Sequence, residues 1–208
     1  MDIITGSFIV FTLVLFAAIS PGPDLLITLR NSLGAGRKSG IYTALGIGAG
    51  IYVHVFYSII GLAVIIYQSI LLFNIIKWAG AAYLLWMGIK ALRSSGWKIS
   101  SEECETKDKA AYRSFAQGFI TNALNPKATL FFLALFTQVI SPGTEVTIQL
   151  WYGTICSFVA MIWFSIVALM LTHRPVRQSL SSVSVWIDRA TGAFFIALAA
   201  RLALSKAA

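Results

Sequence analysis

Six long apolar segments make up most of the chain, and they constrain its fold more than any other feature. They cover residues 8–33, 41–67, 70–92, 115–140, 146–171 and 185–204. A helix needs about 20 residues to cross a bilayer. In lipid, only helices and closed barrels satisfy every backbone amide and carbonyl, and these segments are too long and too evenly apolar for barrel strands. We therefore predict an all-α integral membrane protein with six transmembrane helices.

Composition supports this fold class and leaves little room for anything else. Of the 208 residues, 58% are hydrophobic and 12% are charged, whereas soluble domains are about 45 to 50% apolar and about 25% charged. Six spans take roughly 120 residues. The remainder is enough for connections but not for a soluble catalytic domain, so we predict that the chain is not an enzyme.

Residues 1–7 contain Asp2 and no basic residue, unlike a signal peptide, and we expect the first segment to be retained.

The distribution of basic residues predicts the orientation in the membrane. The formal net charge is +8, but the Lys and Arg residues cluster around 30–38, 90–113 and 174–177, between apolar segments. By the positive-inside rule these three regions are cytoplasmic, which places both termini in the periplasm. Arg201 and Lys206 argue mildly against this orientation. We expect membrane lipid, and no nucleic acid, as a partner.

The chain divides into two similar halves. Residues 96–112 mix acidic and basic residues and read as a cytoplasmic linker between 1–95 and 113–208. Residues 79–85 can be aligned weakly with 190–196. With three spans in each half, the second half is inverted relative to the first, as in many transporters. The sequence leaves a homodimer open.

Each half has an interruption in its first span. Two prolines within one apolar segment remove backbone donors and break the helix, and matched interruptions predict a binding site near the bilayer midplane. The predicted substrate-binding residues are Ser20, Pro21, Gly22, Pro23 and Asp24 in the first half, and Asn122, Asn125, Pro126 and Lys127 in the second.

The chemistry of a broken helix suits a zwitterion. Freed carbonyls and freed N–H groups carry partial charges of opposite sign. We expect Asp24 to bind an ammonium group or a proton, Lys127 to contact a carboxylate or balance charge, and Asn122 and Asn125 to hydrogen-bond the substrate. A salt bridge between Asp24 and Lys127 that only holds the halves together is the alternative.

Three other features have a functional and a structural interpretation. His54 is a candidate for proton coupling, since its unperturbed pKa is near 6.5, and a packing histidine is the alternative. Gly46 and Gly50 predict close helix contact. Cys104 and Cys156 are too few for a disulfide framework or a metal cluster, so we predict neither a metal nor another cofactor.

The motifs resemble those of the lysine exporter / homoserine-threonine resistance (LysE/RhtB) family. They are SPGPD at 20–24, GRKSG at 36–40, WAGAAYL at 78–84 and NALNPK at 122–127. The resemblance implies a bacterial inner-membrane protein that exports small amino acids such as threonine or homoserine, driven by proton antiport. Within the family, the motifs of this chain are more similar to those of the threonine exporter branch. An intramembrane thiol carrier, an intramembrane hydrolase and a passive amino-acid channel are the competing functions.

Overall fold

The described part of the chain is entirely helical. The computed structural model describes residues 2–68, 70–96, 111–140, 144–170 and 174–204, and none of these lies in a strand. Their helices are α1 (Ile3–Ile19), α2 (Pro23–Gln68), α3 (Ile70–Leu92), α4 (Ala111–Ala123), α5 (Pro126–Val139), α6 (Val146–Met170) and α7 (Arg174–Leu204). The predicted all-α class is confirmed for these residues.

Fewer helices than predicted meet a length and hydropathy test for a membrane span. Among the described residues, Pro23–Ile60, Val146–Met170 and Val183–Leu204 meet it, and α4 with α5 makes a fourth span if the pair, bent by 57°, is counted as one. Helix α1 is apolar but has only 17 residues. Among the described residues, three or four spans are therefore clear by length and hydropathy, and the predicted number of six is not confirmed.

The connection predicted between the first two segments is a break in the helix at Gly36, and the helices on its two sides are together labelled α2. Helix α2 runs through residues 34–40 with a kink at Gly36, where φ is 81° and ψ is 174°. This left-handed backbone conformation is open to glycine and strained for other residues. A single glycine thus redirects the chain without a loop. Helix α7 also begins earlier than the predicted residue 185.

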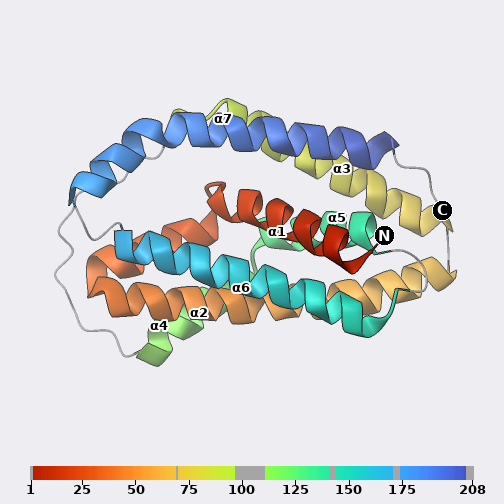
Figure 1. Cartoon of the computed structure of the whole chain (residues 1–208), viewed down its shortest axis with the longest axis horizontal. Helices are drawn as coiled ribbons and strands as arrows, with labels where there is room; N and C mark the ends of the chain where they lie inside the picture. Colours follow the sequence, from red (N-terminus) through yellow and green to blue (C-terminus); the bar gives the residue numbers. More distant parts are fainter. Residues whose placement is uncertain (1, 69, 97–110, 141–143, 171–173, 205–208) are drawn as a thin grey trace.

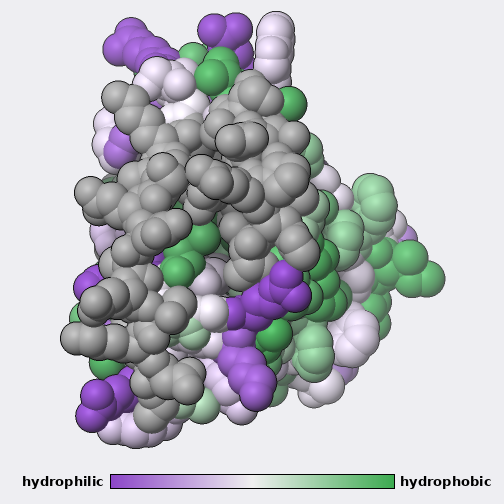
Figure 2. Space-filling model, turned by 90° about the vertical axis from the view of Figure 1, so that its left-hand side faces the viewer, coloured by the Kyte–Doolittle hydropathy of each residue, from purple (hydrophilic) through white to green (hydrophobic). Residues whose placement is uncertain are grey.

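The helices form three layers (Figure 1). Helices α3 and α7 pack side by side along one edge, α2 packs against both α4 and α6 along the other, and α1 and α5 lie between these groups. The kink of α2, the end of α3 and the starts of α4 and α7 gather at one end of the molecule, and α1 begins at the opposite end. Figure 2 views the molecule from the first of these ends, where hydrophilic side chains are scattered over the surface and hydrophobic ones cover one flank.

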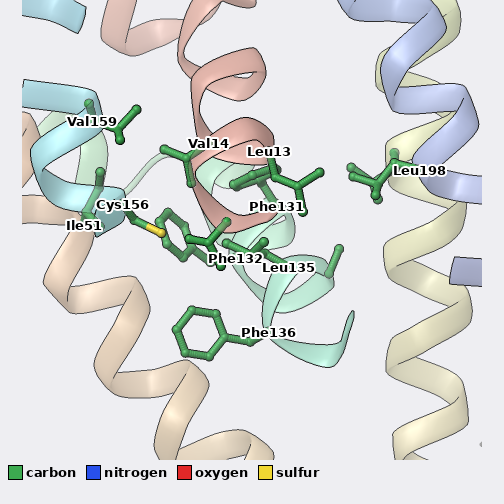
Figure 3. Packing of buried hydrophobic residues seen from close by; sticks show 14 of the residues in the cluster. Leu13, Val14, Ile51, Phe131, Phe132, Leu135, Phe136, Cys156, Val159 and Leu198 are labelled. Carbon is green, nitrogen blue, oxygen red and sulfur yellow. The ribbon is translucent and has the colours of Figure 1, made fainter. Parts of the chain in front are cut away.

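An apolar core surrounds the middle layer (Figure 3). The Phe131, Phe132, Leu135 and Phe136 side chains of α5 lie there with Leu13 and Val14 of α1, Ile51 of α2 and Cys156 and Val159 of α6. Large apolar side chains elsewhere are exposed, among them Phe8, Ile60, Phe158 and Trp186. An apolar outer surface is what a bilayer requires.

Glycines bring the backbones of α2 and α4 into direct contact. A Cβ added at Gly46 would lie 2.0 Å from the carbonyl oxygen of Phe115, and one at Gly118 would lie 2.1 Å from that of Thr43. A Cβ at Gly50 would lie 2.9 Å from Asn122 Oδ1. The predicted role of Gly46 and Gly50 in close helix contact is confirmed.

We predict that Gly46→Val destabilises the protein by at least about 3 kcal/mol, the upper end of the usual cost of overpacking, because the obstructing atoms belong to the backbone. Leu45→Val is the matched control, since Leu45 is the neighbouring residue and is 39% exposed. Thermal unfolding of both variants in detergent measures the difference, and equal melting temperatures would contradict the close contact.

Candidate functional site

The first interruption lies between α1 and α2. Helix α1 ends at Ile19, and Ser20 has an extended backbone with φ −62° and ψ 133°, its N–H donating to the carbonyl of Phe16. Helix α2 begins at Pro23. A proline at the first helical position loses nothing, because that N–H has no partner inside the helix. The break occurs where the two prolines predicted it.

The second interruption lies between α4 and α5. Asn125 caps the start of α5, and its side-chain oxygen accepts a hydrogen bond of 3.0 Å from the backbone N–H of Lys127. Pro126 occupies the first turn of α5, and the two helices meet at 57°. The second predicted break is therefore also present.

The side chain of Asp24 joins the two interruptions. Its Oδ2 accepts hydrogen bonds from Asn122 Nδ2 at 2.9 Å and from Asn125 Nδ2 at 3.1 Å. Both asparagines are 2% exposed. Residues about a hundred positions apart in the sequence thus form one buried polar cluster, as the matched positions of the breaks predicted.

Lys127 completes the first interruption from the second half of the chain. Its Nζ donates to the carbonyl oxygens of Ser20 at 2.7 Å, Ala17 at 3.0 Å and Pro21 at 3.4 Å. These carbonyls lie at the end of α1, where a helix carries partial negative charge. The ammonium of Lys127 therefore caps a helix, and the alternative of a direct salt bridge with Asp24 is not what the structure has.

Two acceptors in the cluster have no donor. Asp24 Oδ1 and Asn122 Oδ1 are buried and form no hydrogen bond within the described residues. Buried polar atoms of this kind are uncommon and call for an explanation. The surplus here consists of acceptors, so the missing partner is a hydrogen-bond donor.

A cavity of about 50 Å³ adjoins these acceptors. Its lining combines the polar cluster with apolar side chains from α1, α2, α5 and α6. The lining residues are Val14, Ala17, Ala18, Ser20, Gly22, Asp24, Leu25, Ile47, Ile51, Asn122, Asn125, Lys127, Ala128, Phe131, Phe132, Ala160 and Phe164. Within the described ranges, no three His, Cys, Asp or Glu side chains come together as a metal site.

A larger cavity, of about 730 Å³, lies on the other side of Lys127. It extends from the first interruption to the end of α3 and includes the basic residues Lys90 and Arg93. Ser20, Gly22, Asn125 and Lys127 line both cavities. A Cβ at Gly22 would lie 3.1 Å from Lys127 Cδ, so the Lys127 side chain and Gly22 form part of the wall between the two spaces.

His54 lies directly behind the polar cluster. It is fully buried, its Nε2 is 2.9 Å from the carbonyl oxygen of Asn122, and its ring stacks on Phe132 at 5.5 Å between centroids. Its Nδ1 is 2.8 Å from Tyr57 Oη, which donates to the carbonyl oxygen of Thr129 at 3.2 Å. Sequence analysis missed Tyr57, although the spacing of three residues from His54 on one helix was a usable signal.

A polar cluster buried between two interrupted helices, in an apolar all-α protein, is typical of membrane transporters. Residues 15–206 match the family described as LysE type translocator, and the chain belongs to this family. The resemblance drawn from the motifs is confirmed. No solved structure matches the chain.

Several relatives have names that state an efflux activity. The chain is 29% identical to the threonine efflux protein of Escherichia coli (strain K12) over 192 residues, which cover 91% of this chain and 93% of the relative. It is 32% identical to the leucine efflux protein of Salmonella choleraesuis (strain SC-B67) over 196 residues, 91% and 90% of the two chains. It is 34% identical to the homoserine/homoserine lactone efflux protein of Salmonella typhimurium over 125 residues, 60% of each chain. The family is one of amino-acid efflux transporters, and the prediction that the chain is not an enzyme is confirmed.

We predict that Lys127→Met lowers the free energy of unfolding by about 3 kcal/mol, the upper end of the range for a hydrogen bond to a charged group. The substitution removes the donor from the carbonyls of α1 while keeping most of the side-chain volume. Lys90→Met is the matched control, because Lys90 is exposed and its amine makes a cation–π contact with Trp86, 5.1 Å from the ring centroid, without capping a helix among the described residues. Denaturation in detergent compares them, and equal stabilities would show that Lys127 is not a structural cap.

Proposed function

We propose that the protein exports a small zwitterionic amino acid, threonine, homoserine or a similar one, from the cytoplasm in exchange for protons. The observation that carries this proposal is the pair of unpaired acceptors, Asp24 Oδ1 and Asn122 Oδ1, beside a cavity at two matched helix breaks. The threonine, homoserine and leucine efflux activities named for the relatives support the substrate class.

Each end of a zwitterion has a place at this site. The ammonium group donates to Asp24 Oδ1 and Asn122 Oδ1, which supplies the missing donors. The carboxylate lies at the start of α2, where the first N–H groups of a helix have no intrahelical partner and carry partial positive charge. Ser20, Pro21, Gly22, Pro23, Asn125 and Pro126 shape the site by holding the two breaks open.

The cavity of about 50 Å³ at the two breaks needs a path by which a substrate can enter. The larger cavity, which is lined by Lys90 and Arg93 near the end of α3, is the proposed cytoplasmic vestibule. Movement of Lys127 away from Gly22 joins the two spaces. While the two spaces are joined, the released Lys127 ammonium pairs transiently with the carboxylate of the entering amino acid, before the substrate reaches its position at Asp24 and the start of α2.

The same proposal includes six spans in two inverted repeats, 1–95 and 113–208, joined by the linker 96–112. Helix α1 with the start of α2 forms one interrupted span, and α4 with α5 forms its counterpart. The kink of α2, the end of α3 and the starts of α4 and α7, which carry or adjoin Arg37, Lys90, Arg93 and Arg113, gather at one end of the molecule, and α1 begins at the other. This arrangement supports periplasmic termini in a bacterial inner membrane.

We predict that Asp24→Asn reduces efflux at least tenfold, because an amide cannot neutralise the substrate's ammonium group. The assay loads proteoliposomes with radiolabelled L-threonine, L-homoserine or L-leucine and follows efflux with and without an imposed pH gradient. Asp2→Asn is the control, since Asp2 is exposed and caps α1 through Thr5, a role that Asn also fills.

The assay separates the proposal from its rivals. Efflux against a concentration gradient that depends on the pH gradient supports antiport. Downhill flux that ignores the pH gradient identifies a passive channel. Wild-type efflux from Asp24→Asn would show that Asp24 does not bind the substrate.

We predict that replacing both cysteines, as Cys104→Ser with Cys156→Ala, leaves efflux within about twofold of wild type. Cys156 is buried in the apolar core (Figure 3), and Cys104 lies outside the described residues. A thiol carrier needs two cysteines that can exchange electrons. Loss of efflux in this variant, with normal membrane insertion, would favour the thiol carrier.

A further inference from the structure

The hydrogen bonds around His54 need one more proton than a neutral imidazole has. The carbonyl of Asn122 only accepts, so His54 Nε2 must carry a proton to bond it at 2.9 Å. The carbonyl of Thr129 also only accepts, so the Tyr57 hydroxyl uses its proton there. Nδ1 must then carry a second proton to bond Tyr57 Oη at 2.8 Å. All three contacts are hydrogen bonds only when the ring is an imidazolium.

A neutral ring retains two of the three hydrogen bonds. Nε2 still donates to Asn122, and the Tyr57 hydroxyl turns to donate to Nδ1, which leaves the carbonyl of Thr129 without this donor. Protonation therefore breaks no hydrogen bond and adds one, by rotation of a single hydroxyl group. Burial of a charge is costly unless the charged group is hydrogen-bonded. Here each N–H of the charged ring has an acceptor, the carbonyl of Asn122 for Nε2 and the hydroxyl of Tyr57 for Nδ1.

Asn122 connects this ring to the substrate site. Its backbone carbonyl accepts from His54, and its side-chain Nδ2 donates to Asp24 Oδ2 at 2.9 Å. Besides Asp24, titratable groups near this cluster are Tyr57, Lys127 and Cys156, and the surrounding helices also carry Tyr42, Tyr52, Tyr112, Tyr152, Arg30, Arg37, Lys38 and Arg113. Of these, Tyr57 hydrogen-bonds the ring, Lys127 donates to the end of α1, and Cys156 lies in the core.

We propose that His54 is the binding site of the counter-proton, and that this proton and the ammonium group of the amino acid exclude each other across Asn122; the proposal rests on the antiport function above. An empty, ionised Asp24 attracts a proton to His54. An ammonium group at Asp24 cancels that attraction and adds repulsion, because charges separated by a low-dielectric interior interact strongly. A proton taken from water on the periplasmic side displaces the amino acid outward. Its release to water on the cytoplasmic side restores the site.

The central experiment measures protons directly. Addition of the amino acid selected by the efflux screen to purified protein in weakly buffered detergent releases a proton from the wild type. At pH values where His54 is protonated, the dissociation constant rises about tenfold per pH unit as pH falls, as linkage requires for one competing proton. His54→Gln keeps an N–H for Asn122 and an acceptor for Tyr57 but cannot titrate. We expect it to bind the amino acid, release no proton and lose uphill, gradient-driven efflux while retaining downhill flux.

Two further variants keep the test decisive. Tyr57→Phe removes the group that accepts from the charged ring, so proton release shifts to lower pH, and this variant tests the proposal even if His54→Gln does not fold. His173→Gln changes the other histidine of the chain, outside the described residues, and should behave as wild type.

The outcomes separate this proposal from the function on which it rests. If wild-type efflux depends on the pH gradient and His54→Gln still releases a proton on binding, the proton site lies elsewhere while antiport stands. If wild-type efflux ignores the pH gradient, antiport itself is wrong. An unshifted proton-release profile in Tyr57→Phe would show that the Tyr57 hydroxyl does not stabilise the charged ring.

Discussion

The interaction on which the site depends is the hydrogen bonding of the Lys127 ammonium to the carbonyls at the end of α1. A helix that stops inside a membrane exposes carbonyls that no water satisfies. The first half of the chain interrupts its helix with prolines, and the second half supplies the cation that makes the interruption tolerable. The reverse also holds, since Asp24 of the first half accepts hydrogen bonds from Asn122 and Asn125 at the second break. Neither break is complete alone.

The parts of this site that were predicted are those fixed by local chemistry. Proline cannot continue a helix, so both breaks could be placed from the sequence, and charged residues at bilayer depth had to face a partner. The identity of that partner could not be predicted for Lys127, because it is a set of backbone carbonyls, and backbone carries no sequence signature. The connection between the first two segments was also placed from the sequence, since the break at Gly36 lies beside the basic residues that indicated it. The sequence did not show that a single glycine with a positive φ would make this break, with helix directly on both sides.

The surroundings of the site differ in how tightly they pack. Helices α2 and α4 touch through their backbones at Gly46 and Gly118, which holds His54 on one helix against the carbonyl of Asn122 on the other. The α3–α7 pair contacts the remaining helices much less extensively. The large cavity adjoins α3, and a third cavity of about 270 Å³ lies between α1 and α7. Rigid packing therefore lies behind the polar cluster, and the space for movement lies in front of it.

The proposed exchange of an ammonium group for a proton relies on this division. The side-chain donors at the site are already used, by Asp24 and by the carbonyls of α1, whereas the buried acceptors Asp24 Oδ1 and Asn122 Oδ1 have no donor among the described residues. These acceptors favour a positively charged group at the proposed site. In this proposal the negative charge of Asp24 attracts both cations. The ammonium group binds at Asp24 itself, and the proton binds behind it at His54. The close contact of α2 and α4 fixes the distance between the two positions, so the two positive charges cannot separate to reduce their repulsion. Binding of one cation therefore requires release of the other. In this proposal, repulsion between the two charges couples binding of the proton to release of the amino acid. Helix movement then controls from which side of the membrane each cation reaches the site.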